Sequence, residues 1–203
     1  MRLIPPRLVL ASSSPRRRQL LAEAGYEFDV VPPGIDESGG LCSHCGPAEL
    51  VTDLARQKAA DVAGRLAQRP ERPGGLLVVA CDTVAECGGQ ILGKPRDEAD
   101  ARAMLKQLSG QRHRVYSGLC VWPLPATAPP VVQVEITTLR MDVLSGEQLD
   151  DYLAGGQWEG KAGAFGYQDG LDWVHVLEGS ESNVVGLPME RLREMLARIT
   201  RSL

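Results

Sequence analysis

Residues 8–17 read Leu-Val-Leu-Ala-Ser-Ser-Ser-Pro-Arg-Arg, and residues 19–24 continue as Gln-Leu-Leu-Ala-Glu-Ala. A short apolar run that passes through serines into helix-forming residues predicts a strand, a turn and a helix. The first turn of a helix has unpartnered backbone N–H groups and the positive end of the helix dipole, so it favours an anion. We therefore expect phosphate to bind where this strand meets this helix, with the hydroxyls of Ser12, Ser13 and Ser14 and the guanidinium groups of Arg16 and Arg17 as further donors.

A plainer interpretation of the same residues stays open. Ser14 can act as the helix N-cap, Pro15 suits the first helical position, and the arginines can be solvated. The net charge of −4 and the pI near 5.5 give no independent sign of a polyphosphate ligand. Local sequence does not decide between a helix cap and a phosphate site.

The composition is typical of a soluble enzyme, with 43% hydrophobic and 24% charged residues in 203. This length predicts a single domain, residues 1–203, with two lobes. No apolar run reaches the ~18 to 20 residues that span a bilayer, and no signal-peptide pattern opens the chain, so we expect a cytoplasmic protein without a membrane partner. The five scattered cysteines favour free thiols, and the acidic balance argues against a general nucleic-acid surface.

Strand-like and helix-like segments alternate along the chain, which predicts α/β architecture. The expected strands are 7–11, 27–31, 76–81, 114–122, 131–143 and 173–177, and the expected helices are 16–24, 47–65, 97–108, 145–154 and 189–199. Residues 32–47 contain turn-forming residues throughout and are expected to form a loop.

Asp82 directly follows the most apolar of the expected strands. Ligands of open α/β sheets gather beyond the carboxyl ends of the strands, so Asp82 is placed to bind a divalent cation or to accept a proton from a water that attacks phosphorus. An aspartate that merely starts a turn is the alternative. Asp36 and Glu37 could supply a second acidic ligand, although loop carboxylates are commonly just solvated.

Lys58, in the expected helix, and Lys94, in a turn, are cationic candidates for the phosphate chain. Residues 161–168, Lys-Ala-Gly-Ala-Phe-Gly-Tyr-Gln, combine Lys161 with small residues, aromatics and the amide of Gln168. Small residues let the backbone approach a ligand, an aromatic can stack on a base, and a glutamine can read a base edge. The alternatives are exposed lysines and a glycine-bearing core turn.

Two further patterns are weaker. Cys42, His44 and Cys45 have metal-like spacing, but no second cysteine pair follows, so a closed zinc site is not favoured. His113 and His175 have no Ser or Cys nearby in sequence that would suggest a nucleophilic triad, and His175 is expected to be structural.

Eight short motifs, in order, together resemble the Maf family of nucleoside triphosphate pyrophosphatases. They are residues 11–17, 35–37, 54–58, 82–84, 93–96, 108–110, 161–168 and 185–188. The resemblance covers nearly the whole chain. It implies an inosine-triphosphatase-like α/β fold with a mixed central sheet and two lobes around a cleft.

The resemblance also implies a reaction and its residues. The family hydrolyses a nucleoside triphosphate between the α- and β-phosphates with a divalent metal, here Mg²⁺ or Mn²⁺. By matching position, Asp82 is the expected proton acceptor, with Glu37, Lys58 and Lys94 as further active-site residues. Asp82 and Glu37 are the candidate metal ligands. The expected substrate-binding residues are Ser12, Ser14, Arg16, Arg17, Thr83, Lys161 and Gln168.

Three of these positions differ between Maf subgroups. Arg16, Thr83 and Gln168 are similar to the subgroup that acts on dTTP and UTP, whereas the 7-methyl-GTP subgroup has Trp, Gln and Glu there. A neutral amide can both donate to and accept from a pyrimidine edge, while a carboxylate better suits a cationic methylated guanine. Departures from the family pattern are Cys81, Gln157 and the unusual loop after Glu37.

Other functions remain to be weighed. A relaxed housecleaning pyrophosphatase acting on CTP or modified nucleotides is the enzymatic alternative, and a nucleotide-binding regulator of septum formation is the non-enzymatic one. A nucleic-acid module built on the arginines is disfavoured by the net charge. The sequence leaves the oligomeric state open, with a homodimer as one outcome.

Overall fold

Two long antiparallel strands, β3 (Leu76–Cys87) and β5 (Arg112–Leu124), form the centre of the fold. They are paired from Leu76 opposite Leu124 to Glu86 opposite Arg114. Both are rich in apolar residues and are buried over most of their length, as expected of strands covered on both faces. The computed structural model describes residues 6–35, 46–68, 75–125 and 128–202.

The sheet is seven-stranded and mixed, in the order β2-β1-β3-β5-β6-β7, with β4 paired to β3. Strand β1 (Arg7–Leu10) runs parallel to both β2 (Phe28–Val30) and β3. The pairs that involve β4 (Gln90–Leu92), β6 (Val131–Met141) and β7 (Val174–Glu178) are antiparallel. The α/β class with a mixed central sheet is therefore confirmed.

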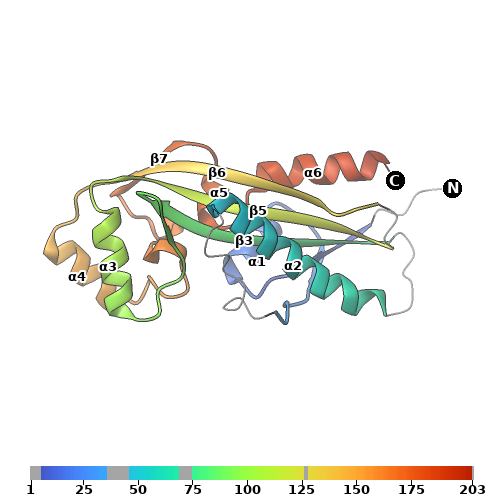
Figure 1. Ribbon diagram of the computed structural model, residues 1–203, viewed down its shortest axis with the longest axis horizontal. Helices are drawn as coiled ribbons and strands as arrows, with labels where there is room; N and C mark the ends of the chain where they lie inside the picture. The colour runs from blue at the N-terminus through green and yellow to red at the C-terminus, as the bar shows by residue number, and fades with distance from the viewer. Residues whose placement is uncertain (1–5, 36–45, 69–74, 126–127, 203) are drawn as a thin grey trace.

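The helices fall into two groups along the sheet (Figure 1). Helices α3 (Glu98–Leu108) and α4 (Gly146–Ala154) gather at one end of the long strands. Helices α2 (Pro47–Ala67) and α6 (Met189–Ser202) lie along the other part, on opposite sides of the strands. The shorter elements are α1 (Pro15–Glu23), α5 (Glu181–Val185) and the 3₁₀ turns η1 (Ala162–Ala164) and η2 (Tyr167–Asp169).

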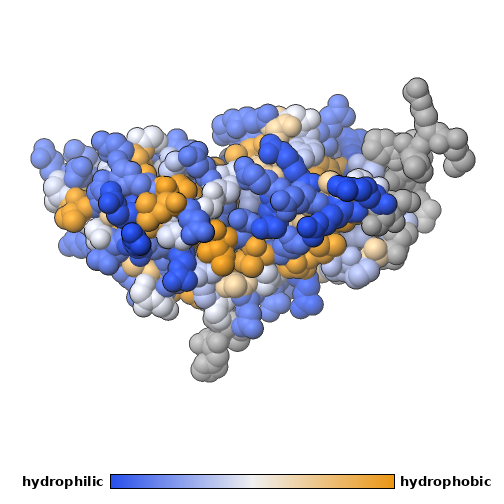
Figure 2. Space-filling view, turned by 90° about the horizontal axis from the view of Figure 1, so that it is seen from above, coloured by the Kyte–Doolittle hydropathy of each residue, from blue (hydrophilic) through white to orange (hydrophobic). Residues whose placement is uncertain are grey.

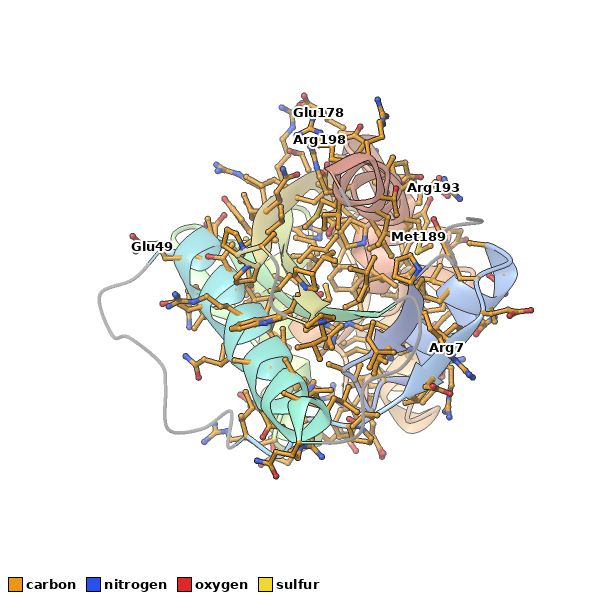
Figure 3. All side chains as sticks on the ribbon, turned by 90° about the vertical axis from the view of Figure 1, so that its right-hand side faces the viewer. Arg7, Glu49, Glu178, Met189, Arg193 and Arg198 are labelled. Carbon is orange, nitrogen blue, oxygen red and sulfur yellow. The ribbon has the colours of Figure 1, made fainter. Side chains whose placement is uncertain are left out.

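Separate apolar clusters hold the two sides of the sheet. Ala55, Ala59 and Val62 of α2 pack on one side of β1, β3 and β5, whereas Leu192 and Met195 of α6 pack on the other. Viewed along the long axis, side chains fill the space between these helices and the strands, while Arg193 and Arg198 of α6 point outward (Figure 3).

One face of the molecule shows hydrophobic patches among hydrophilic residues (Figure 2). Among the described residues, the exposed large hydrophobic ones are Val30, Ile136, Val143 and Leu177. Within the described residues, none of the helices combines the length and the apolar character needed to cross a bilayer.

The structure corrects the position of Asp82. We predicted it to follow strand 76–81, but β3 continues to Cys87 and Asp82 lies inside it. The strand continues because its pairing with β5 extends beyond Asp82, which lies opposite Gly118. The polar side chain did not end the strand because its backbone hydrogen bonds were still satisfied by a neighbour.

Four of the described elements were not predicted: β4, α5, η1 and η2. All four are too short to show a periodic pattern of apolar residues. The other expected elements are present, with ends that differ by a few residues.

Candidate functional site

The site lies where one edge of β3 has no neighbouring strand. Strand β1 pairs with β3 only up to Val79, and β4 begins to pair with it at Ala85. Across Ala80–Val84 this edge is left open within the part of the chain that the structure describes. Successive side chains of a strand point to opposite faces, so an open edge lets Asp82 and Thr83 border the same hollow.

A cleft of about 370 Å³ occupies this position. Its lining includes every predicted site residue within the described part of the chain: Ser12, Ser14, Arg16, Arg17, Lys58, Asp82, Thr83, Lys94, Lys161 and Gln168. Glu37, together with Asp36, Cys42, His44 and Cys45, lies outside the described residues. The volume falls within the range of small-molecule sites.

Asp82 and Lys58 form a buried ion pair at this cleft. The Nζ atom of Lys58 donates to Oδ1 of Asp82 over 2.6 Å, and the two side chains are only 4% and 10% exposed. Lys58 reaches the strand because α2 packs closely on β5. A Cβ on Gly118, opposite Asp82, would collide with the backbone of Val51 and Thr52 in α2. A small residue at this position therefore allows the ion pair to form.

The turn between β1 and α1 is both a helix cap and part of the cleft. Ser14 is the N-cap, and its hydroxyl accepts from the backbone N–H of Arg17 at 3.5 Å. Pro15 is at the first helical position. The hydroxyl of Ser12 accepts from the backbone N–H of Ser14 at 3.1 Å. The capping interpretation is thus confirmed, and the same turn opens into the cleft with the N-terminus of α1.

Arg17 belongs to a hydrogen-bond network behind this turn. Its guanidinium donates to the Gly186 carbonyl at 2.8 Å and to the Thr83 hydroxyl at 3.2 Å. The Thr83 hydroxyl also lies 2.8 Å from that of Ser117, its register partner on β5. The side chains of Arg17 and Thr83 are therefore held in place before any ligand arrives.

Arg16 spans the cleft in a different direction. Its guanidinium donates to the carbonyl of Gly160 over 2.9 Å. Burial, followed by the positive charge of Arg17, lowers the pKa of Arg16, whereas the charge of Asp169 opposes this shift. Arg16 thus connects α1 with the segment that precedes Lys161.

Lys161 is buried at the cleft and forms an ion pair with Asp169. Gln168, the neighbour of Asp169, is exposed, as is Lys94 on its turn. The sequence did not point to Asp169, because a single carboxylate after a glutamine has no local pattern. Its role is visible only once the chain between residues 161 and 169 is folded.

The cleft lining also includes Ser13, Phe165 and Gly186, which lie in the motifs recognised from the sequence, together with Pro33 and Glu159, which the sequence did not suggest. Gly186 contributes its backbone carbonyl, which no side-chain motif reveals. Phe165 was noted only as one of two aromatics. It is buried and packs edge-on against His113, with ring centroids 5.3 Å apart.

The described donor set suits a metal that keeps water and phosphate ligands. Within residues 6–35, 46–68, 75–125 and 128–202, no three His, Cys, Asp or Glu side chains form a cluster that could hold a metal ion. Mg²⁺ is commonly bound by one or two carboxylates together with substrate phosphates. Asp82, which supplies a carboxylate to the cleft beside the phosphate-binding turn, fits that mode of binding.

The remaining cysteine and histidine candidates are buried or hydrogen-bonded within the fold. Cys81, Cys87 and Cys120 are free and buried, and burial raises the pKa of Cys120 to about 12. The Nε2 atom of His175 in β7 is hydrogen-bonded to the Oδ2 atom of Asp142 at 2.8 Å, in keeping with the structural role expected for this histidine. His113 is 2% exposed, and burial lowers its pKa to about 4.

A family model described as Maf-like protein matches residues 7–199. The chain belongs to the Maf family. The match covers both groups of helices and the cleft between them, so the resemblance found in the sequence is confirmed, and with it the expected Maf fold.

Relatives of this Maf protein carry consistent names. A dTTP/UTP pyrophosphatase from Rhodopirellula baltica is 50% identical over 193 residues, which cover 95% of this chain and 82% of the relative. One from Pelotomaculum thermopropionicum is 42% identical over 94% of this chain and 95% of its own. Among solved structures, a HAM1 protein from Coxiella burnetii aligns over 97% of this chain and 99% of its own, with 15% identity and a TM-score of 0.49.

Proposed function

We propose that this Maf protein hydrolyses dTTP and UTP to the nucleoside monophosphate and pyrophosphate. One observation carries the proposal: all the predicted site residues within the described part of the chain, from five different motifs, line a single cleft. The names of the relatives at 50% and 42% identity support the same activity. They also support dTTP and UTP over CTP or modified nucleotides as substrates.

The polar groups of the cleft fall into two sets, one suited to the phosphates of the nucleotide and one suited to its base. The N-terminus of α1 and the Ser12 and Ser14 hydroxyls offer donors and partial positive charge for the phosphates. Arg16 and Gln168 lie in the same cleft and can address the base edge. Lys94, exposed on its turn, adds positive charge for the leaving pyrophosphate.

Asp82 is the group we assign as proton acceptor. A water oxygen attacks the α-phosphorus and forms the new P–O bond, while its proton passes to the Asp82 carboxylate. The bond from the α-phosphorus to the oxygen that bridges to the β-phosphate breaks, and pyrophosphate leaves with that oxygen. Lys58 fixes the orientation of the carboxylate through its 2.6 Å hydrogen bond.

A divalent cation fits beside Asp82. Asp82 would hold Mg²⁺ or Mn²⁺ together with substrate phosphates, and Glu37 is the second ligand expected from the sequence. When bound, such an ion neutralises developing charge on the phosphate oxygens. The cytoplasmic location, the lack of a nucleic-acid partner and a homodimeric state stay predictions from the sequence, as does the single two-lobed domain.

A nucleotide panel with product analysis tests the proposal. Purified protein with Mg²⁺ or Mn²⁺ should release pyrophosphate and the monophosphate from dTTP and UTP, with a higher kcat/KM than for CTP, GTP or ATP. A site that hydrogen-bonds one base edge should discriminate by orders of magnitude. Folded protein that releases pyrophosphate from neither dTTP nor UTP would contradict it.

A further inference from the structure

Residues 160–169 form a closed loop at one wall of the cleft. The ammonium of Lys161, at its start, pairs with the carboxylate of Asp169, at its end. Both side chains are largely buried, with exposed fractions of 10% and 13%. The backbone N–H of Asp169 donates to the Gly166 carbonyl at 3.0 Å. The ion pair therefore ties together two points that are eight residues apart.

The pair is closely surrounded by its own loop and by α4. Tyr152 of α4 places its hydroxyl 3.5 Å from the Asp169 carboxylate and accepts from the backbone N–H of Gly166 at 3.2 Å. A Cβ on Gly166 would collide with the Lys161 ammonium and the Asp169 carboxylate. Ala164 has φ of 62°, a left-handed conformation that a non-glycine residue adopts only when its surroundings enforce it.

This loop connects directly to both residues that can address the base. Gln168 immediately precedes Asp169, so the carboxylate fixes the backbone from which the Gln168 side chain extends. The carbonyl of Gly160, immediately before Lys161, accepts the 2.9 Å hydrogen bond from Arg16. Movement of the Lys161–Asp169 pair would therefore displace two groups together: the Gly160 carbonyl, which accepts the hydrogen bond from Arg16, and the backbone that carries the Gln168 side chain.

We infer that Asp169 is a positioning residue for nucleotide selection, acting through Lys161 to hold Gln168 and Gly160 in the geometry that distinguishes the hydrogen-bonding edge of uracil or thymine from that of cytosine. The inference rests on the proposed function. It also reassigns Lys161, which the sequence suggested as a substrate contact. The Lys161 ammonium is buried and already neutralised by Asp169, so its part is to hold the loop and not to bind the phosphates.

The variant Asp169→Asn keeps the size of the side chain and removes its charge. We expect the preference for UTP over CTP, as a ratio of kcat/KM, to fall roughly 10- to 100-fold, because a small misplacement of substrate-positioning groups has effects of this size. KM for UTP should rise, whereas kcat should change much less, since Asp82 and Lys58 are untouched. The inhibition constant of inorganic pyrophosphate should stay the same.

Two further variants complete the experiment. Asp172→Asn removes an exposed carboxylate from the same loop region and should match the parent in every measurement. Asp169→Glu retains the charge but lengthens the side chain by one methylene. It should fold even where Asp169→Asn does not, and it should show the same loss of UTP preference with unchanged pyrophosphate inhibition.

The outcomes separate the inference from the proposed function. Parent protein that hydrolyses neither UTP nor dTTP contradicts the proposed function itself. A parent enzyme that prefers UTP, with Asp169 variants that retain this preference, overturns the inference even if their thermal stability is lower. A raised inhibition constant for pyrophosphate with the base preference intact also overturns it, because Lys161 would then act on the phosphates.

Discussion

Two buried lysine–aspartate pairs lie at the same cleft, which is lined by Lys58, Asp82 and Lys161, but they are built in different ways. Lys58 and Asp82 come from a helix and a strand, and the cleft lies at the open edge of that strand. Lys161 and Asp169 lie eight residues apart in one loop and are enclosed by Tyr152. We interpret the first pair as orienting a reactive carboxylate and the second as shaping a loop. The same chemical pair thus serves two purposes according to what surrounds it.

A glycine lies beside each pair, and the two glycines differ in the kind of atom that an added Cβ would meet. A Cβ on Gly118 would meet backbone atoms of α2, which cannot move without shifting the helix. A Cβ on Gly166 would meet the ends of the Lys161 and Asp169 side chains, which can rotate away. The absence of a side chain at Gly118 is therefore needed for the packing of α2 on the sheet, whereas its absence at Gly166 is needed only for the Lys161–Asp169 ion pair.

The most severe test of the first pair is Asp82→Asn. The amide cannot accept the proton from water, so kcat for UTP should fall by at least ~10²-fold, the lower range for loss of a general base. Binding of UTP, measured by calorimetry, should change by only a few-fold. A variant that keeps turnover within tenfold of the parent would remove Asp82 from the reaction. A protein acting only as a nucleotide-binding regulator would retain its function in this variant.

Gly118→Ala tests the packing that brings Lys58 to Asp82. We expect the free energy of unfolding to fall by about 3 kcal/mol, because overpacking against backbone is poorly relieved. The kcat should fall as well, since α2 carries Lys58. The control is Gly64→Ala, on an exposed face of the same helix with open space around the new Cβ. It should stabilise the protein by ~0.5–1 kcal/mol. Equal stability of the two variants in urea denaturation would contradict this account.

Low pH should lower the free energy of unfolding through His113, which lies beside the loop that contains Lys161 and Asp169. Burial lowers the pKa of His113 from 6.5 to about 4, and its ring packs on Phe165 of the 160–169 loop. The contribution of neutral His113 to the free energy of unfolding is fully present above pH 6.5 and is lost as the pH drops towards 4. In that range the unfolded chain takes up a proton at this residue that the folded chain does not. The loss should be on the order of 3 kcal/mol. Urea denaturation at pH 7 and pH 4.5 measures it, and His113→Leu should lose this contribution. Parallel pH dependence of parent and variant would disprove it.

The mildest change is Gly166→Ala. The colliding side-chain ends can rotate away, so unfolding free energy should fall by about 1 kcal/mol or less. The displaced ion pair should nevertheless lower the UTP-over-CTP preference several-fold. Comparison with Gly118→Ala is decisive: that variant should lose stability and kcat, whereas Gly166→Ala should lose mainly selectivity. A stability loss as large as that of Gly118→Ala would show that the second pair also supports the fold.

Much of the site could be predicted from the sequence because its residues lie in short contiguous motifs. The Ser-Ser-Ser-Pro-Arg-Arg stretch contains the cap and the strand–helix junction within a few residues, so local rules describe it. Asp82 lies in the lining of the cleft, although the prediction that it follows the end of a strand was wrong. The strand continues because Asp82 pairs with Gly118 of β5, which lies 36 residues further along the chain and leaves no local sign.

The sequence by itself determined the alternation of strands and helices, the family, and which motif residues to examine. These depend on local periodicity and on ordered motifs, which are properties of neighbouring residues. Tertiary structure alone decided that β3 has an open edge between β1 and β4, that Gly118 brings Lys58 to Asp82, and that Asp169 neutralises Lys161. Each of these is a contact between segments whose approach is set by packing, and packing depends on the whole folded chain.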